Sequence, residues 1–369
     1  MRKKINVFGS ATNKQELDLL KEVLEMEWLG TGSKTDKFEA EIQKKLGLGN
    51  FLMLNSGSNA LYMACKLLKI PPGSEIILPT FTWISCAQAV ILAGHRPVFC
   101  DVEYDTQNVT AELIIPHITK KTGAIMIVHY AGKPVDINPI IDLGFPIIED
   151  AAHAVDSYVD GKACGSLGNI GIYSFDAVKN IAAGEAGGIT MRNLDLFDKA
   201  KSLRYSGIEK SGFDQSKNKS KWWEYDITDV FPKMMPNDLT SAVALAQLRK
   251  LKDLQQKRKS IWEMYQNAFK DFEWIETPLE CNLNEQHSYF TYFIKVPKRD
   301  DLANFMLESG IYTNLRYHPL HLNKIYNQTK KKLVNSETLN KNGLNIPLHP
   351  NLSREDVAYV IDKIVRFYK

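Results

Sequence analysis

Lys179 occupies an unusual position for a lysine, between a short apolar stretch and a run of small residues in YSFDAVKNIAAGEAGGI (173–189). Lysine normally seeks water, and nothing near this residue resembles an exposed charged face. Burial lowers the pKa of a lysine, and the neutral amine that results is the form that attacks carbonyl groups to make Schiff bases. Two interpretations follow, either a surface lysine or an amine kept for chemistry.

Two other stretches could hold parts of a flat, anionic ligand. In LNSGSNAL (54–61), a strand-like run is followed at Gly57 and Ser58 by the start of a helix, whose N–H groups and positive end attract anions. An ordinary serine helix cap is the alternative. In PTFTWISCAQAV, Trp83 follows a strand end, where it is either a core aromatic or a side chain that stacks on the flat ring of a cofactor.

A carboxylate and a histidine follow a third apolar stretch. Asp150 closes PIIED (146–150), and a part-buried carboxylate there needs a cationic or protonated partner. The alternative is a helix cap or a loop aspartate bonded to the backbone. His153 lies three residues further on, and a lone histidine is more often structural.

Taken together, these groups match the needs of pyridoxal 5′-phosphate. The helix start would take the phosphate, and the ring would stack on Trp83. Asp150 would keep the pyridine nitrogen protonated, which makes the ring an electron sink. Lys179 would carry the cofactor and, once displaced, move a proton.

The elements that position these groups alternate along the first half of the chain. Short apolar runs predict buried strands at 75–79, 97–102, 123–130, 146–150, 171–175 and 187–191. Helical patterns such as 59–68 lie between several of them. This alternation predicts an α/β fold with a mainly parallel sheet and helices on both faces. Ligands in such sheets bind beyond the carboxyl ends of the strands.

The pattern changes after residue 208. A stretch rich in Lys, Ser and Asn (208–221) predicts a mobile surface excursion, and a long helix is expected from Asn237 or Asp238 to Phe269. A strand at 288–296 and a helix at 301–310 follow. We therefore predict a large domain over 1–245, and a linking helix with a small α+β domain over 246–369.

Bulk composition narrows the class of protein. The 46 basic and 43 acidic residues leave a net charge of +3, which argues against nucleic-acid or membrane binding by bulk charge. No long apolar run and no secretory signal pattern is evident. The five cysteines are scattered without a CxxC pair, which favours reduced thiols over disulfides or a metal site. A cytoplasmic protein is expected.

An ordered set of motifs resembles the DegT/StrS family of sugar-nucleotide aminotransferases over almost the whole chain. The motifs are WLGTGSKTDKFEAEI, GSNAL, PTFTW, VHYAGKPVD, IEDAAHA, YSFDAVKNIAAGE, PLHLNKIY and IPLHPNLSREDVAYVI. The resemblance implies a fold-type I, aspartate aminotransferase-like architecture with pyridoxal 5′-phosphate. It also implies a homodimer with shared active sites, L-glutamate as amino donor and a keto-sugar nucleotide as acceptor.

Residue roles carry over by position. The resemblance implies Lys179 as the Schiff-base lysine, Asp150 as partner of the pyridine nitrogen, and His153 near the phenolic oxygen. The remaining cofactor contacts that it implies are Trp83, Gly57, Ser58 and Ser174, with Lys233 reaching across the dimer in FPKMMPNDL. The candidate substrate contacts are Thr31, Gly32, Arg316 and His318; Arg316 stands where the family frequently has histidine.

VHYAGKPVD is closer to the motif of the family's 4-aminating enzymes than to the HLYG motif common in its 3-aminating enzymes. The resemblance therefore implies amination at C4 rather than C3, in amino-sugar synthesis for a surface polysaccharide or glycoconjugate. A C3-dehydratase of the same family would carry histidine in place of Lys179. A transaminase of a small phosphorylated ketone is a further alternative. A non-catalytic regulatory protein would have lost Lys179 or Asp150, and a plain nucleotide-binding protein would show a glycine-rich dinucleotide fingerprint.

Overall fold

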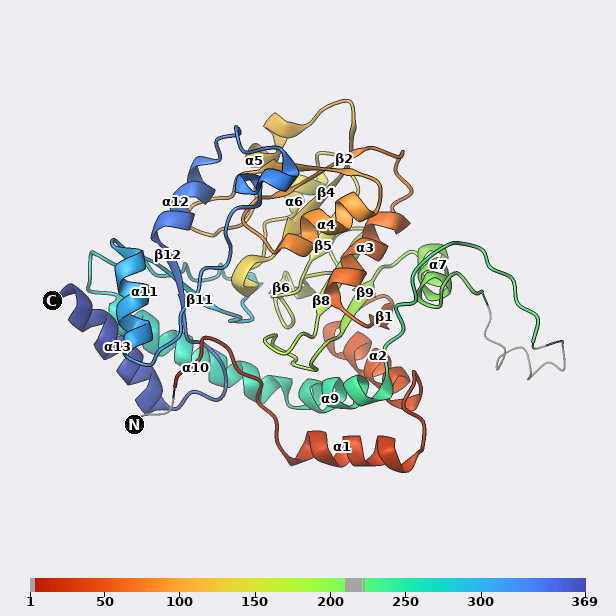
Figure 1. Ribbon diagram of the computed structural model, residues 1–369, viewed down its shortest axis with the longest axis horizontal. Helices are drawn as coiled ribbons and strands as arrows, with labels where there is room; N and C mark the ends of the chain where they lie inside the picture. Colours follow the sequence, from red (N-terminus) through yellow and green to blue (C-terminus); the bar gives the residue numbers. More distant parts are fainter. Residues whose placement is uncertain (1–3, 210–220, 222) are drawn as a thin grey trace.

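The computed structural model describes residues 4–209, 221 and 223–369. Its main element is a seven-stranded sheet in the order β1-β9-β8-β5-β4-β2-β3, and Figure 1 shows helices on both sides of it. The strands are β1 (Phe51–Leu54), β2 (Glu75–Pro79), β3 (Arg96–Cys100), β4 (Thr122–Val128), β5 (Ile147–Asp150), β8 (Ile170–Ser174) and β9 (Gly187–Thr190). Pairing is parallel from β3 through β2, β4 and β5 to β8, whereas β9 is antiparallel to both β8 and β1. The predicted α/β class with a mainly parallel sheet is confirmed.

Side chains of this sheet alternate between two cores, because successive residues of a strand point to opposite faces. On β4, Ala124 and Met126 belong to the core beneath α3 (Gly57–Leu67) and α4 (Ile84–Leu92). Ile125 and Ile127 belong to a second core on the other face. Burial on both faces explains why the strands read as apolar runs rather than as an alternating pattern.

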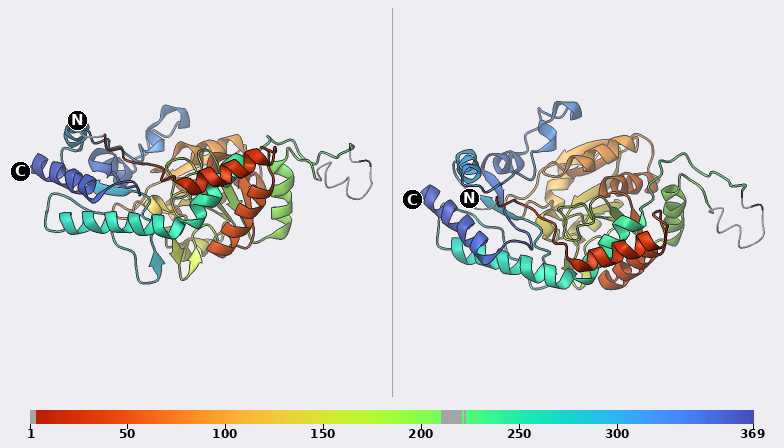
Figure 2. Two further views of the ribbon diagram at one scale, coloured as in Figure 1. Left: turned by 90° about the horizontal axis from the view of Figure 1, so that it is seen from below. Right: turned by 60° about the horizontal axis from the view of Figure 1, so that its bottom comes forward.

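The N-terminal helices α1 (Lys14–Glu25) and α2 (Ser33–Leu46) pack against α9 (Asp238–Arg249), as Figure 2 shows from two sides. A single long helix was predicted from residue 237 or 238, but the structure has two helices. Helix α9 ends before Lys250, and α10 (Leu251–Phe269) begins after it. Lys250 leaves helical geometry at φ −99° and ψ 9°, and its amine bonds the Ala11 carbonyl and Glu16. Asn237 is the N-cap.

A two-stranded antiparallel sheet, β11 (Tyr292–Lys295) and β12 (Gly343–Ile346), is packed with α10, α11 (Arg299–Glu308) and α13 (Arg354–Tyr368) in a separate core. The strand predicted at 288–296 starts late, because Ser288 and Phe290 donate their N–H groups to Gly132 and Ala131 instead. The proposed domain boundary at 245–246 falls within α9, and the division stays a prediction.

Among the described residues, the remaining α-helices and strands are short or peripheral. They are α5 (Ala111–Ile114), α6 (Asn138–Ile141), α7 (Leu194–Arg204), α12 (Val334–Asn342), β6 (Tyr158–Val159), β7 (Lys162–Ala163) and β10 (Glu285–Gln286). Most of the excursion predicted at 208–221 lies outside the described residues. Within the described part of the chain, no helix has the length and apolar character needed to cross a bilayer.

Candidate active site

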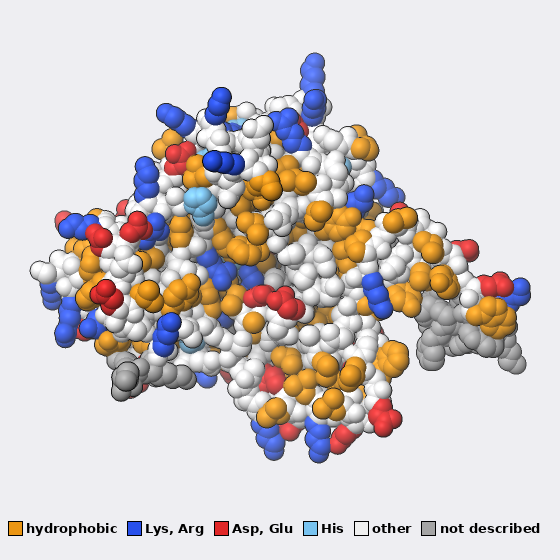
Figure 3. Space-filling model, viewed as in Figure 1, with side chains coloured by type: hydrophobic (Ala, Val, Ile, Leu, Met, Phe, Trp, Pro, Cys, Tyr) orange, Lys and Arg blue, Asp and Glu red, His pale blue; other side chains and the backbone are white. Residues whose placement is uncertain are grey.

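The carboxyl ends of β5 and β8 open into a cavity of about 360 Å³. Figure 3 shows this face hollowed near its centre, with basic side chains visible inside the hollow. The predicted residues that line the cavity are Gly57, Ser58, Trp83, Asp150, His153, Ser174, Lys179 and Arg316. Stretches separated by more than 200 residues therefore meet in one place, at the position expected for a ligand in a parallel sheet.

Lys179 lies in the turn that follows β8, where its N–H donates to the Asp176 carbonyl at 2.9 Å. The side chain is partly buried, and its amine lies 4.8 Å from the centre of the Phe290 ring. Loss of hydration and the positive charge of Arg316 lower the pKa of Lys179 to about 7, although Asp150 and Asp176 act in the opposite direction. A large share of this amine is therefore neutral and nucleophilic near neutral pH.

Asp150 ends β5 with its side chain only 5% exposed. Its Oδ1 accepts the Ala152 N–H at 2.9 Å, and its Oδ2 accepts the Cys86 thiol at 3.1 Å. Each carboxylate oxygen can accept about two hydrogen bonds, so capacity is left for a donor in the cavity. A protonated ring nitrogen is such a donor.

His153 forms part of the cavity wall behind Asp150. Its ring stacks on Phe290 with 4.1 Å between centroids, and its Nε2 lies 2.9 Å from the Tyr317 hydroxyl. Burial is the largest cause that lowers the pKa of His153, and the charges of Lys179 and Arg316 add to it, so the ring is neutral. Nδ1 is buried and has no hydrogen-bond partner among the described residues. The hydrogen-bonding capacity of that nitrogen is therefore unused within the described residues.

The helix start that was predicted to bind an anion is the start of α3. The Ser56 side chain caps the helix, and the first-turn N–H groups of such a helix have no intrahelical partner. Strand β9 approaches this turn closely, since a Cβ at Gly187 would lie 2.4 Å from the Gly57 nitrogen. A Cβ at Gly57 would lie 2.8 Å from Cβ of Ser174. Glycine at both positions lets Ser174 and the helix start share one small space.

Trp83 and the segment around Arg316 form the outer walls. Trp83 is 53% exposed, and its ring lies 5.8 Å from that of Tyr317. The Arg316 guanidinium lies 3.9 Å from the centre of the Phe8 ring and donates to the Tyr317 hydroxyl at 3.2 Å. Phe8, Phe290 and Tyr317 were not among the predicted residues, because an aromatic residue far along the chain carries no local signal of such a role.

Four predicted residues lie outside the cavity lining. Thr31 donates its hydroxyl to the Pro236 carbonyl at 2.5 Å, and Gly32 donates its N–H to Asp238 at 2.9 Å. Lys233 is exposed, with its amine 5.6 Å from the centre of the Tyr205 ring, and exposed His318 contacts Asn340. Their predicted roles depend on a partner subunit or a substrate and stay predictions.

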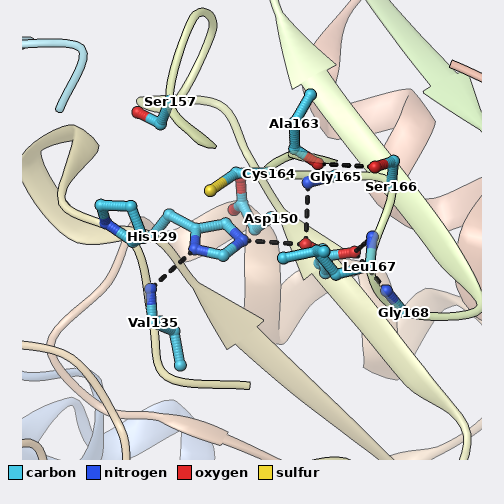
Figure 4. Close-up of polar contacts among 12 residues, drawn as sticks. His129, Val135, Asp150, Ser157, Ala163, Cys164, Gly165, Ser166, Leu167 and Gly168 are labelled. Carbon is cyan, nitrogen blue, oxygen red and sulfur yellow. Dashed lines mark hydrogen bonds and ion pairs between the residues drawn. The ribbon is translucent and has the colours of Figure 1, made fainter. Parts of the chain in front are cut away.

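A buried polar network, drawn in Figure 4, supports the strand end that carries Asp150. His129 accepts the Val135 N–H on Nδ1 at 3.0 Å, so its ring proton is on Nε2, which donates to Glu149 at 3.0 Å. The fully buried Glu149 carboxylate also accepts backbone N–H groups from the loop at 165–168. Sequence reasoning missed this pair, since nothing local distinguishes Glu149 from a solvent-facing residue.

These residues fit pyridoxal phosphate group by group. The start of α3 suits a phosphate, the buried carboxylate of Asp150 suits a protonated ring nitrogen, and the open Nδ1 of His153 suits a phenolic oxygen. The neutral amine of Lys179 suits an aldehyde. The fold and the site together define a pyridoxal-phosphate-dependent enzyme.

Comparison with known proteins agrees with this class. Residues 10–365 match the DegT/DnrJ/EryC1/StrS aminotransferase family, and the chain belongs to that family. It is 36% identical over 97% of its length, and 95% of the relative's, to the dTDP-4-dehydro-2,3,6-trideoxy-D-glucose 4-aminotransferase of Saccharopolyspora spinosa. The spore coat polysaccharide biosynthesis protein SpsC of Bacillus subtilis is 30% identical over 95% of this chain and 94% of its own.

Solved structures give the same result. The aminotransferase TlmJ of Streptoalloteichus hindustanus superposes with a TM-score of 0.92 at 33% identity, covering 98% of this chain and 97% of its own. The pyridoxal-phosphate form of the sugar aminotransferase Spr1654 of Streptococcus pneumoniae has a TM-score of 0.89 at 26% identity, covering 99% of both chains. The protein is a pyridoxal-phosphate-dependent sugar aminotransferase with a fold-type I architecture.

Proposed function

We propose that the enzyme transfers the amino group of L-glutamate to a keto-sugar nucleotide, at C4 rather than C3. The observation that carries this proposal is the joint placement of Lys179, Asp150 and Arg316 around one cavity. The 36% identity to a relative named as a 4-aminotransferase of a dTDP-linked keto sugar supports the acceptor and the position. The relative named for spore coat polysaccharide supports a role in a surface polysaccharide or glycoconjugate.

Lys179 and Asp150 have distinct roles in this reaction. Pyridoxal phosphate, when bound, supplies an aldehyde and a ring that accepts electrons. Lys179 offers a neutral amine to hold the cofactor, and its amine afterwards moves a proton within the cavity. The buried carboxylate of Asp150 would accept a hydrogen bond from the ring nitrogen and so favour the protonated form of that ring. Trp83 and His153 line the same cavity, where Trp83 would stack on the ring and Nδ1 of His153 would meet the phenolic oxygen.

Arg316 supports an amino acid as the donor. Its Nε is buried without a hydrogen-bond partner in the described part of the chain, and its guanidinium faces the same cavity as Lys179. The α-carboxylate of an amino donor is one bond from the carbon that reacts, so it must lie close to Lys179 during the reaction. A guanidinium pairs with a carboxylate through two parallel hydrogen bonds. We therefore assign Arg316 to that carboxylate.

The function is tested by two half-reactions on the purified protein loaded with cofactor. Glutamate alone should remove the visible absorption band of the bound cofactor, and a dTDP-linked 4-keto sugar should restore it. The position of the new amine is read from the product by NMR. If no keto-sugar nucleotide restores the band while a small phosphorylated ketone does, the acceptor is wrong.

Arg316→Gln tests the donor site separately. Loss of a charged hydrogen-bonded contact, worth about 1.5–3 kcal/mol, should raise the KM for glutamate by about 10- to 100-fold. The KM for the keto sugar should stay nearly constant. An effect on the sugar alone would place Arg316 on the acceptor instead.

A homodimer with shared active sites completes the proposal. Four predicted residues lie outside the cavity of their own chain, namely Thr31, Gly32, Lys233 and His318. In a dimer, we propose that they lie at the mouth of the partner subunit's cavity. Two large apolar side chains are exposed here: Trp83, which lines the cavity, at 53%, and Leu92, which lines an adjoining hollow, at 70%. Such exposed apolar groups are typical of an interface.

A further inference from the structure

A buried thiol lies directly behind Asp150. Cys86, in the first turn of α4, is fully buried, is not part of the cavity lining, and has its Sγ 3.1 Å from Oδ2 of Asp150. On its other side, Sγ lies 3.3 Å from the hydroxyl of Thr82, which does line the cavity. The thiol therefore connects the cavity wall to the carboxylate.

The direction of these hydrogen bonds follows from counting protons. The Cys86 thiol has a single proton, and this proton is donated to Oδ2 of Asp150. The thiol then has no proton left for Thr82, and the Thr82 hydroxyl must be the donor in the second contact. The result is a chain from hydroxyl to thiol to carboxylate, in which each donor polarises the next.

Both oxygens of Asp150 are thereby held by groups of the protein. The Ala152 N–H holds Oδ1 from the loop after β5, and Cys86 holds Oδ2 from α4. Two contacts from two different elements prevent rotation of the carboxylate plane. They also leave one acceptor position on each oxygen for a group within the cavity.

We propose that Cys86 is a positioning residue for Asp150, whose thiol fixes the carboxylate in the orientation that receives the ring nitrogen. This inference rests on the proposed role of Asp150. Burial raises the pKa of the Cys86 thiol well above its ordinary value, and the charge of Asp150 raises it further. The sulfur consequently keeps its proton, so Cys86 donates to Asp150 and neither ionises nor reacts.

A purely structural thiol would also be fully buried, and Cys65 provides the matched control. It lies on α3 in the same core as Cys86 and is equally buried. Within the described residues, no hydrogen bond joins it to Asp150. Cys65→Ala removes the same atoms from the same core as Cys86→Ala, so any difference between the two variants reports the contact with the carboxylate.

The contact itself can be measured by infrared spectroscopy of the full-length protein, using the S–H stretching band that Cys86→Ala removes. A thiol bonded to a carboxylate should absorb at lower frequency than one bonded to a neutral amide, because charge-assisted hydrogen bonds are stronger. Asp150→Asn should therefore move this band to higher frequency. A band that does not move in Asp150→Asn would overturn the proposal, whatever reaction the enzyme catalyses.

The positioning role is measured on the cofactor-loaded enzyme. Cys86→Ala should lower kcat by about 3- to 10-fold relative to Cys65→Ala, the effect of losing one hydrogen bond. It should also shift the pH midpoint of the cofactor absorption band. Cys86→Ser keeps a donor and should recover both values to within about twofold.

Equal kcat and equal midpoints for Cys86→Ala and Cys65→Ala would overturn the positioning role, even with a shifted infrared band. Failure of the proposed function is distinct, since the wild-type enzyme itself would then fail to respond to glutamate. The infrared comparison would still report whether the thiol and the carboxylate are bonded.

Discussion

The amine of Lys179 should gain reactivity as the pH rises through neutrality. Its pKa is lowered to about 7, chiefly by burial and also by Arg316, so the protonated and unreactive form dominates below that value. The rate at which cofactor-free protein takes up pyridoxal phosphate should therefore rise with pH and level off about one unit above 7. Stopped-flow absorbance across this range measures the midpoint.

Arg316→Gln serves as a check on the cause of that midpoint. Removing the positive charge should move the midpoint to higher pH, while burial still keeps it below the ordinary value near 10.4 for lysine. A midpoint that does not respond would mean that burial alone sets the pKa of Lys179.

Asp150→Asn keeps the shape of the side chain but removes the charge that, in the proposed function, holds a proton on the ring nitrogen. We expect kcat to fall by about 100-fold or more, the size seen when one preorganised electrostatic contact is lost. The cofactor should still bind, since the helix start and Lys179 are unchanged. Fluorescence titration and steady-state kinetics measure the two effects, with the exposed Asp195→Asn as control. Undiminished turnover would remove Asp150 from the chemistry.

Many of the residues that line the cavity were predictable, because the sequence next to each of them carries a signal. Lys179, Asp150 and Gly57 each stand next to a short apolar run, so strand ends marked them in the sequence. Tyr317 and Phe290 are set by packing between distant segments, which no local pattern records. Arg316 was visible only as a departure from a familiar motif, and its open Nε became evident from the packing around it.

At the scale of elements, strand positions were predicted to within a few residues because parallel strands buried on both faces are apolar throughout. The break between the two helices at Lys250 was not predicted, because it depends on contacts with Ala11 and Glu16 rather than on a helix-breaking residue. Strands β1 and β9 are antiparallel neighbours, an arrangement that an alternating pattern of strands and helices does not indicate.

Asp238 couples two elements and should be critical for stability. It is fully buried in the first turn of α9, and its carboxylate accepts N–H groups of Gly32, Lys34 and Thr35 and the Thr35 hydroxyl at 2.8–3.0 Å. Asp238→Ala leaves these buried donors unsatisfied at the start of α2. We expect the free energy of unfolding to fall by about 3 kcal/mol or more.

Urea denaturation followed by circular dichroism measures this change as a lower midpoint at constant slope. Asp253→Ala is the matched control, because Asp253 also lies in the first turn of a helix but is exposed. Equal midpoints for the two variants would mean that water or other groups replace the Asp238 contacts.

At the scale of the whole molecule, the cavity of one chain contains the proposed catalytic residues but not all of the proposed cofactor contacts. Lys179 and Asp150 face the same cavity, whereas Lys233 is exposed and outside the lining. If Lys233 serves the partner's cavity, two different defects can be separated between subunits. Lys179→Ala disables the cavity of its own chain, and Lys233→Glu would disable only that of its partner.

Mixing these two inactive variants should therefore restore activity. In a heterodimer, one of the two cavities has both an intact Lys179 and an intact Lys233. Random exchange makes about half of the dimers heterodimers with one good site in two, so about a quarter of wild-type activity is expected. Unfolding and refolding the variants together, followed by an assay, measures it.

The control mixes Lys179→Ala with Asp150→Asn. Both changes affect the cavity of their own chain, so each cavity of a heterodimer carries one defect and no activity should return. Light scattering confirms that every mixture is dimeric. Activity that is only the sum of the two separate variants would show that Lys233 does not act across an interface, and the site would then belong to one chain.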